Sequence, residues 1–335
     1  MDKTYRAWML KKKGGPEALV LLELPLADPG TGQIRVRVEA AGVGATDLTV
    51  LQGRYLFAPK IPFVPGYELA GIVDAIGPGV TGFELGQRVA ALTVWGAFAE
   101  MAVREATEFV RVPEGVSSRD AAAVVLNSVT AWQMIHRVAK VNPGQTALVT
   151  AAAGGVGSAA LQLLQLAGVK TYGSCSAKKL ALVQRLGATA LNREAGEIDE
   201  QLLRLEPRGV DVAFDAIGGT NTARCIRAVR RGGMVVGYGF VGAPGTGQVL
   251  GTFANLFVGA RLKGRRGTAY GITALYRRDP KPFHEDLPKI FELLKEKKID
   301  PAISHTFDLL EAPKALELLA TGSVEGKTVL ARGAS

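Results

Sequence analysis

A glycine-rich turn between two apolar segments is the part of this chain best suited to chemistry. Gly154, Gly155 and Gly157 directly follow a short apolar run over residues 146–151. Because glycine has no Cβ, Gly154 and Gly155 let the backbone approach a pyrophosphate, and Gly157 lets the next helix pack closely on the strand. The amide groups at that helix start carry partial positive charge, which suits phosphates. The segment predicts the strand, turn and helix that open a dinucleotide-binding unit.

This glycine pattern is incomplete, because Ala152 occupies the place of the first glycine of G-x-G-x-x-G. A glycine pattern alone is weak evidence, and an ordinary tight turn between a strand and a helix is the alternative. The context favours dinucleotide binding. A buried strand is expected before the turn, a helix over residues 156–167 after it, and further α/β units follow.

Polar and basic residues follow the second expected strand of this unit. Enzymes for the unphosphorylated dinucleotide usually place Asp or Glu about 20 residues beyond the glycines, where this chain has Ser174, Ser176, Lys178 and Lys179, with Arg193 further on. Hydroxyl, ammonium and guanidinium groups suit a phosphate on the adenosine ribose. The alternative is that the lysines decorate an exposed helix start. The residue types favour NADPH.

The pattern of expected elements changes along the chain. In the first 125 residues, short alternating or apolar runs lie between Gly- and Pro-rich turns, which indicates a mostly β domain. From about residue 126, strands and helices alternate, which indicates a parallel sheet covered by helices. A later helix and a final strand are expected to return to the first domain. The expected strands cover residues 34–40, 69–76, 88–92, 97–103, 146–150, 171–174, 210–215, 234–238 and 327–331, and the expected helices cover 156–167, 177–186, 198–205, 222–229 and 287–295. The prediction is an α/β chain with a β-rich domain of residues 1–125 and 263–335 and a doubly wound parallel-sheet domain of residues 126–262.

Composition and charge exclude several classes of protein. The chain has 335 residues, of which 47% are hydrophobic, and a formal net charge of +9. Its basic residues are scattered and no nucleic-acid-binding motif is legible, so no nucleic-acid partner is predicted. One basic cluster, RLKGRRG over residues 261–267, is interpreted either as a solvated loop or as a contact for an acidic cofactor or substrate tail.

Cysteine usage and hydropathy bear on location. Cys175 and Cys225 are the two cysteines and have no metal or redox spacing, which favours a cytoplasmic, disulfide-free protein. Residues 141–169 lack charge but are interrupted by Pro143, glycines and polar side chains, so no membrane span is predicted. The first 15 residues lack the apolar core of a signal peptide.

Several segments in order, including PFVPGYELAGIV, AAAGGVGSAALQLLQLAG, GVDVAFDAIGG and EGKTVLAR, resemble the medium-chain dehydrogenase/reductase superfamily. Within it, the chain is similar to the zinc-independent quinone oxidoreductase branch, which includes enoyl-thioester reductases. The similarity covers nearly the whole chain. It implies a GroES-like catalytic domain beside a Rossmann domain, with substrate and nicotinamide in the cleft between them.

The resemblance also bears on metal binding. Zinc-dependent relatives ligate the metal with a cysteine in G-V-C-x-x-D and a histidine in G-H-E, where this chain has Gly44 and Tyr67. Its histidines, His136, His284 and His305, are widely separated. We therefore expect no catalytic metal. Conjugated carbonyls and quinones accept hydride without one, because the negative charge spreads onto oxygen.

Tyr55, in QGRY, matches the tyrosine that enoyl-thioester reductases place near the reacting alkene. It is predicted either to donate a proton or hold the enolate oxygen, or only to line the pocket. Leu56 replaces the usual following proline, and Gly44 replaces the asparagine of the branch's G-V-N segment. The pocket is expected to contain Tyr55, Phe57, Tyr67, Trp95 and residues 250–276.

The resemblance assigns cofactor contacts to further residues. Thr130 matches a threonine near the nicotinamide, the alternative being a hydroxyl bonded to its own helix backbone. Lys179 matches a lysine that pairs with the ribose phosphate, and Arg193 stands where a tyrosine often stacks near the adenosine. The predicted cofactor-binding residues are Thr130, Gly154, Gly155, Val156, Gly157, Ser174, Ser176, Lys179, Arg193, Tyr238, Phe240 and Lys327.

Together these observations predict an NADPH-dependent, zinc-independent reductase of an enone, an enoyl thioester or a quinone. The alternative is an NADPH-binding structural or regulatory protein of the same fold, which the replacement of the asparagine by Gly44 would suit. A homodimer through edge strands is expected from the resemblance alone. The sequence does not identify the substrate.

Overall fold

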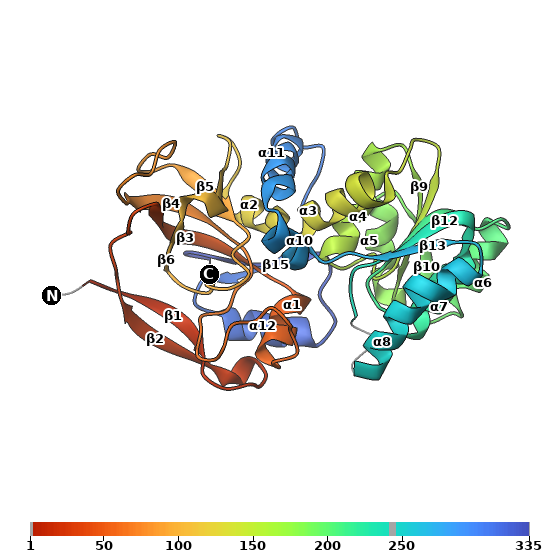
Figure 1. Cartoon of the computed structure of the whole chain (residues 1–335), viewed down its shortest axis with the longest axis horizontal. Helices are drawn as coiled ribbons and strands as arrows, with labels where there is room; N and C mark the ends of the chain where they lie inside the picture. The colour runs from red at the N-terminus through yellow and green to blue at the C-terminus, as the bar shows by residue number, and fades with distance from the viewer. Residues whose placement is uncertain (1–2, 241–245, 335) are drawn as a thin grey trace. The chain divides into compact units, whose positions relative to one another are not determined.

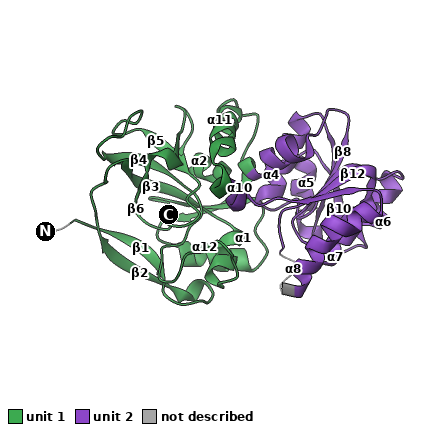
Figure 2. Ribbon diagram, in the orientation of Figure 1, with its two compact units in different colours: residues 1–129, 276–335 green, residues 130–275 purple. Residues whose placement is uncertain are grey.

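The computed structural model describes residues 3–240 and 246–334. The chain divides into two compact units, which Figure 2 colours separately. Unit 1 contains residues 1–129 and 276–335, and unit 2 contains residues 130–275. The first predicted boundary, after residue 125, lies close to this division, whereas the second, after residue 262, lies within unit 2.

Unit 2 is built on a parallel sheet of six strands in the order β10-β9-β8-β11-β12-β13 (Figure 1). The order reverses between β8 and β11, which is the arrangement of a doubly wound dinucleotide-binding fold. Every neighbouring pair is parallel. The strands are β8 (Thr146–Val149), β9 (Lys170–Cys175), β10 (Thr189–Asn192), β11 (Val210–Asp215), β12 (Val229–Gly237) and β13 (Arg266–Ala269).

Helices connect these strands because each has one apolar face that the sheet can bury. In α6, for example, Ile198 and Leu202 are buried one turn apart. The helices of this part of the chain are α3 (Asn127–Trp132), α4 (Gly155–Leu166), α5 (Leu180–Arg185), α6 (Ile198–Leu205), α7 (Thr220–Ala228), α8 (Thr246–Ala254), α9 (Ala260–Leu262) and α10 (Ile272–Arg278).

Most of the α/β pattern was predictable, but two strands were missed. The expected strand over 210–215 and helix over 198–205 are confirmed at their full length. Strands β10 and β13 have only four residues each, lie at the two edges of the sheet, and contain mainly exposed or half-buried residues. An edge strand of this length has no strong apolar pattern to reveal it.

Unit 1 contains a seven-stranded sheet in the order β14-β15-β3-β4-β5-β7, with β6 also paired to β3. The last strand, β15, lies between β14 and β3 and is antiparallel to β3. The end of the chain therefore returns to the first domain, as predicted. The strands are β3 (Gln33–Val43), β4 (Leu69–Ile76), β5 (Arg88–Ala91), β6 (Met101–Glu105), β7 (Phe109–Arg111), β14 (Ile303–Asp308) and β15 (Lys327–Ala331).

A hairpin and four helices complete unit 1. Strands β1 (Thr4–Leu10) and β2 (Leu19–Pro25) form a separate antiparallel pair. The helices are α1 (Ala45–Leu51), α2 (Ser118–Val125), α11 (Lys281–Lys295) and α12 (Ala312–Ala320). The strand expected over 97–103 begins only at Met101. Ala97, Phe98 and Ala99 are buried in the core, and Ala99 forms only an isolated antiparallel bridge with Ala7.

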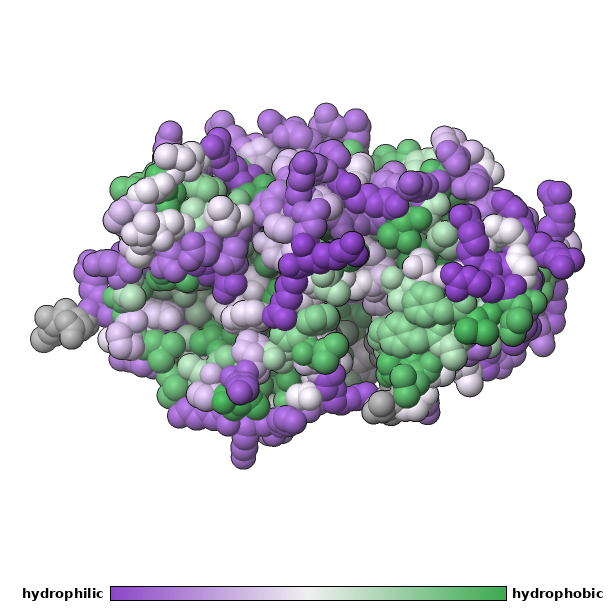
Figure 3. Space-filling model, in the orientation of Figure 1, coloured by the Kyte–Doolittle hydropathy of each residue, from purple (hydrophilic) through white to green (hydrophobic). Residues whose placement is uncertain are grey.

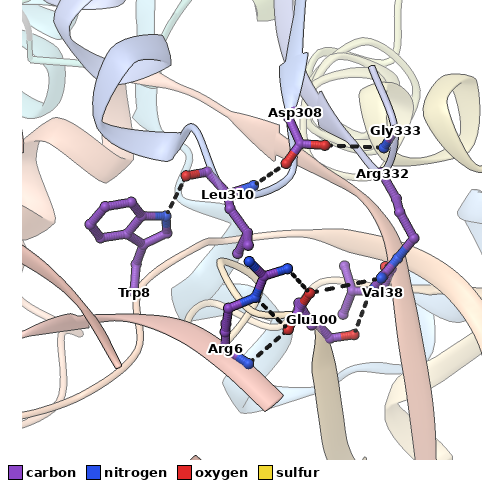
Figure 4. A network of polar contacts seen from close by, with 8 residues as sticks. All are labelled: Arg6, Trp8, Val38, Glu100, Asp308, Leu310, Arg332 and Gly333. Carbon is purple, nitrogen blue, oxygen red and sulfur yellow. Dashed lines mark hydrogen bonds and ion pairs between the residues drawn. The ribbon is translucent and has the colours of Figure 1, made fainter. Parts of the chain in front are cut away.

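Polar contacts join the two ends of the chain within unit 1 (Figure 4). Arg6 Nη2 lies 2.8 Å from Glu100 Oε1, and these contacts hold the pKa of Glu100 below its usual range. The indole of Trp8 donates to the carbonyl of Leu310 at 3.1 Å, and the Arg332 guanidinium donates to the carbonyls of Val38 and Glu100 at 3.3 Å. These hydrogen bonds and the ion pair connect the hairpin, the sheet and the C-terminal segment.

Among the residues described, no helix has both the length and the apolar character needed to cross a membrane. The uncharged stretch over 141–169 is divided mainly between β8 and α4, as its proline and glycines predicted.

Candidate functional site

The turn between β8 and α4 brings backbone atoms unusually close together. Ala151 has a left-handed φ of 49°, and its carbonyl accepts the Gly154 N–H at 2.9 Å. A Cβ on Gly157 would lie 2.4 Å from the Ala151 carbonyl oxygen and 2.7 Å from Ala152 Cα. Only glycine fits there without a shift of backbone, in keeping with the close helix packing expected of Gly157. Gly154 caps α4 without a side-chain hydrogen bond, so the first amides of the helix remain suited to an anion.

Asp215, at the carboxyl end of β11, fixes the segment beside this turn. Its buried carboxylate accepts hydrogen bonds from Asn221 Nδ2 and Thr222 Oγ1, each at 2.7 Å, and from Thr150 Oγ1 at 3.2 Å. The main chain of Asp215 also accepts the Tyr238 N–H at 2.9 Å. Asp215 is not among the residues predicted from the sequence, although an aspartate at the end of a buried strand was a usable signal.

Tyr238 and Phe240 follow the carboxyl end of β12, as predicted. Burial raises the pKa of Tyr238 above its ordinary value. The ring of Phe240 lies 5.3 Å from that of Phe253 on α8, and Phe253 stacks parallel to Phe257 at 6.1 Å. These aromatic side chains give this end of the sheet an apolar wall.

Thr130, on α3, is buried, and its Oγ1 has no hydrogen-bond partner among the described residues. The alternative of a hydroxyl bonded to its own helix backbone is therefore wrong. A buried hydroxyl without a partner costs free energy, so this position fits a ligand that supplies one.

The polar residues predicted to bind the ribose phosphate lie at the ends of adjacent strands. Ser174 is buried in β9, Ser176 and Lys179 are half-buried just beyond it, and Arg193 follows β10. The Arg193 N–H donates to the Cys175 carbonyl at 3.0 Å, which joins the two strand ends.

Glu194, next to Arg193, was not predicted from the sequence as part of this group. Its Oε2 accepts the Ala177 N–H at 3.2 Å. A carboxylate therefore lies beside the predicted phosphate-binding group and uses an amide that a phosphate oxygen would otherwise accept from.

In unit 1, Tyr55 lies in the segment after α1 and forms a pair with Tyr67. The two hydroxyl oxygens are 2.6 Å apart and the rings meet edge to face at 5.9 Å. Tyr67 is only 1% exposed, and its burial raises its pKa far above the usual value. Tyr55 is half-buried and its ring also lies 5.8 Å from Phe57.

Arg277 joins this aromatic group. Its guanidinium lies 5.2 Å from the ring of Phe57 and 5.2 Å from the ring of Trp95, and its Nη2 donates to the Phe57 carbonyl at 3.1 Å. The structure thus gathers Tyr55, Phe57, Tyr67 and Trp95 as expected, while residues 250–275 of the predicted pocket belong to unit 2. Arg277 was missed because it is 220 positions from Phe57 in the chain.

Lys327 is the first residue of β15 in unit 1. Its ammonium is buried and forms an ion pair with Glu68 Oε1, while Glu68 Oε2 accepts the Leu126 N–H at 2.5 Å. This ion pair gives Lys327 a structural role in unit 1, and its predicted cofactor contact stays a prediction.

Asp47 is a second buried acid near this ion pair. Its Oδ2 accepts the Gly44 N–H at 2.9 Å. Burial raises the pKa of Asp47 to about 7, although the Gly44 amide and the charge of Lys327 both act to lower it and the charge of Glu68 adds to the rise. Asp47 thus changes charge near neutral pH.

The described residues contain no group of three or more His, Cys, Asp or Glu side chains that could hold a metal ion. His136 packs on the Trp132 ring at 4.2 Å, and His305 Nδ1 lies 2.9 Å from Ser304 Oγ. His284 lies beside the rings of Tyr276 and Phe283, and burial lowers its pKa.

Two family models match this chain. The alcohol dehydrogenase GroES-like domain matches residues 30–114, within unit 1, and the family described as zinc-binding dehydrogenase matches residues 198–330.

Three curated proteins are similar over nearly the whole chain. A quinone oxidoreductase-like protein 2 homolog from Nematostella vectensis is 31% identical over 98% of this chain and 89% of that protein. A quinone oxidoreductase from Pseudomonas aeruginosa is 31% identical over 95% of this chain and 96% of that protein. A synaptic vesicle membrane protein VAT-1 homolog from Danio rerio is 28% identical over 98% of this chain and 70% of that protein.

A similar solved structure is that of Escherichia coli quinone oxidoreductase complexed with NADPH. It has a TM-score of 0.88 and 27% sequence identity, and the match covers 97% of this chain and 99% of that one. The GroES-like β domain, the doubly wound parallel sheet and these relatives agree with one another. The chain belongs to the medium-chain dehydrogenase/reductase superfamily, in its quinone oxidoreductase branch, and is an oxidoreductase of that type.

Proposed function

We propose that this oxidoreductase uses NADPH to reduce a quinone or a conjugated carbonyl compound without a catalytic metal. The observation that carries the proposal is the combination, in unit 2, of an uncapped helix start after a glycine turn with an unpartnered buried hydroxyl on Thr130. Both features fit a phosphorylated nicotinamide cofactor.

In this proposal, different residues of unit 2 bind different parts of the cofactor. The backbone of Gly154, Gly155, Val156 and Gly157 receives the pyrophosphate. Ser174, Ser176, Lys179 and Arg193 receive the adenosine ribose and its phosphate, with Arg193 and Lys179 supplying positive charge. Thr130 supplies a hydroxyl and Tyr238 and Phe240 supply apolar surface at the carboxyl ends of the strands, where ligands of this fold bind.

The bound cofactor supplies a hydride, and the side chains of unit 1 manage the proton. Hydride addition to a conjugated carbonyl places negative charge on its oxygen, so a nearby O–H group stabilises the product as it forms. The Tyr55 hydroxyl serves this role. With Gly44 and Tyr67 at the positions of the zinc ligands of relatives, the proposal includes no metal.

Cofactor preference gives the sharpest test. We expect the purified chain to bind NADPH more tightly than NADH in calorimetry and to oxidise NADPH with a panel of quinones, enones and enoyl thioesters. Lys179→Gln should lower the NADPH preference, since a charge-assisted contact is worth roughly 10- to 100-fold. Glu194→Gln should raise it, because it removes a negative charge beside the phosphate.

The matched control is Lys178→Gln, which removes the same charge from an exposed side chain one position away. Tighter binding of NADH than NADPH, or no oxidation of either cofactor with any acceptor, would contradict the proposal.

The proposal also covers the assembly of the protein and its location in the cell. The edge strand β13 of unit 2 suits pairing with a second copy, and a homodimer is proposed on that basis. Cys175 and Cys225 are both buried free thiols, which supports a cytoplasmic location.

A further inference from the structure

Arg277 has an unusual position for an exposed arginine, because it is fixed by aromatic rings and not by an acid. Its guanidinium lies against the rings of Phe57 and Trp95 and donates one hydrogen bond to the Phe57 carbonyl. Along the described chain, no carboxylate forms an ion pair with it. Arg104 lies over the same Trp95 ring at 5.9 Å but is paired with Glu108 at 2.7 Å. Of these two arginines that lie over Trp95, Arg104 is thus paired with an acid, whereas Arg277 has aromatic rings and a carbonyl as its neighbours.

The guanidinium also lies close to the proposed proton donor. Its charge acts on the hydroxyl of Tyr67, which is 2.6 Å from the hydroxyl of Tyr55. A guanidinium has five N–H donors in a planar fork that suits carboxylate and phosphate. Because stacking and the Phe57 carbonyl hold the fork in one orientation, little freedom is lost when an anion binds.

Further positive charge surrounds the segment that carries Tyr55. The side chain of Lys13 lies against Gly53, since a Cβ there would be 2.5 Å from Lys13 Cδ and Cε. Arg54 and Lys60 are exposed on the same segment. Asp47 is the only acid between residues 45 and 60, and it is buried. Three cationic side chains therefore belong to, or lie against, the segment that carries Tyr55.

We infer that the substrate of the Tyr55 site is a conjugated carbonyl compound that carries an anionic group, and that Arg277 is the residue that selects it. The inference rests on the proposed reductase function. The anionic group is either a carboxylate on a small enone or the phosphates of a thioester carrier. Both offer anionic oxygens that accept hydrogen bonds from the Arg277 guanidinium.

Matched pairs of acceptors separate charge from reactivity. One pair is 4-oxo-2-pentenoate and its methyl ester, and the other is crotonyl-coenzyme A and the crotonyl thioester of N-acetylcysteamine. With the wild-type chain and NADPH, we expect kcat/KM in one pair to be about 10- to 100-fold higher for the charged acceptor than for the neutral acceptor, after correction for their intrinsic reactivity toward hydride. This factor is typical of a charge-assisted hydrogen bond. The pair that shows the effect identifies the source of the anion.

The substitution Arg277→Gln measures the contribution of the guanidinium. It should lower kcat/KM for the charged acceptor by about 10- to 100-fold, mainly through KM, and leave the neutral acceptor within about twofold. Arg277→Lys should fall between, because it keeps the charge and loses the fork. Arg278→Gln is the matched control, since it removes the same charge from the next exposed residue and should leave both acceptors unchanged.

Four results would overturn the inference. The first is an equal effect of Arg277→Gln on charged and neutral acceptors, which would assign Arg277 to holding the loop in place. The second is no effect on either, and the third is an equal effect of Arg278→Gln. A wild-type chain that oxidises NADPH with neutral and charged acceptors alike would refute the inference and leave the reductase function standing, whereas no oxidation with any acceptor would refute the proposed function itself.

Discussion

The hydroxyl oxygens of Tyr55 and Tyr67 lie 2.6 Å apart, and the proposed function assigns the proton transfer to this pair. When Tyr55 gives its proton to a reduced conjugated carbonyl, its O–H bond breaks, a bond to the substrate forms, and a phenolate remains. The neighbouring Tyr67 hydroxyl can donate to that phenolate, and solvent then returns the proton. Tyr67 is therefore a positioning residue in this scheme.

Single-oxygen deletions test the tyrosine pair. Tyr55→Phe should lower kcat with a neutral enone by about 100-fold or more, as loss of a general acid does, and Tyr67→Phe by about tenfold with little change in KM. The control is Tyr172→Phe, because this buried tyrosine also bonds an oxygen at 2.6 Å, that of Glu206, but within unit 2. Steady-state rates measure all three. A Tyr67→Phe rate equal to wild type would leave Tyr67 with a packing role only.

Asp47 predicts a pH dependence of stability. Its pKa is raised by burial from 3.8 to about 7, so folding takes up a proton between these values, and the stability contributed by the neutral form falls as the pH rises toward 7. Asp47→Asn cannot ionise. As the pH rises from 5 to 8, the free energy of unfolding of the variant should therefore increase relative to that of the wild type, by roughly 2–3 kcal/mol.

Urea unfolding at pH 5, 6, 7 and 8 measures this difference. Asp28→Asn is the control, because its side chain is 94% exposed and its curve should stay parallel to that of the wild type. Parallel curves for Asp47→Asn as well would mean that Asp47 stays ionised in the folded chain.

At the scale of elements, the turn that joins β8 to α4 is the most constrained connection of unit 2. The close approach of Gly157 to the Ala151 carbonyl holds the helix start against the sheet. The order of the six strands then places this helix start next to the end of β11, where the chain order reverses. Strand order and glycine packing together form the place where the proposed function puts the phosphates of the cofactor.

Gly157→Ala is expected to disturb this connection. The added methyl would clash with three backbone atoms of Ala151 and Ala152, so the helix must shift. We expect a loss of about 1–3 kcal/mol in unfolding free energy and of about tenfold or more in NADPH affinity, measured by calorimetry. Gly251→Ala in α8 meets nothing within 4 Å, and a helical alanine there should stabilise slightly. Undiminished NADPH binding by Gly157→Ala would show that the turn does not carry the cofactor.

At the scale of the whole molecule, unit 2 exposes apolar side chains next to its edge strand. Leu262, the last residue of α9, is 82% exposed, and Val258 and Leu250 are also exposed. Figure 3 shows hydrophobic side chains gathered over the part of unit 2 where α8 lies. Apolar surface beside an unpaired strand edge is what a second copy would cover.

Leu262→Glu tests the proposed homodimer. A charge placed in a buried interface should weaken association by at least tenfold, since an unpaired buried charge is costly, and sedimentation velocity over a concentration series measures this. Leu85→Glu, at a leucine 67% exposed in unit 1, should leave association unchanged. A monomeric wild type, or equal association of both variants, would exclude this surface as the dimer contact.

Structural features that depend on neighbours along the chain could be predicted from the sequence. The strands over 69–76 and 327–331, the helix over 198–205 and the glycine turn were legible because apolar period, turn residues and the absence of a Cβ act locally. The return of the chain end to the first domain also followed, since its last strand had no place in the alternating pattern.

Only the tertiary structure decided which distant side chains meet. Lys327 and Glu68 are 259 positions apart, yet they form a buried ion pair. Arg277 reaches Phe57 and Trp95 because α10 ends where the chain re-enters unit 1. The edge strands β10 and β13 are set by pairing with neighbours and not by their own residues. Burial and charge pairing depend on three-dimensional neighbours, and no local pattern in the sequence records them.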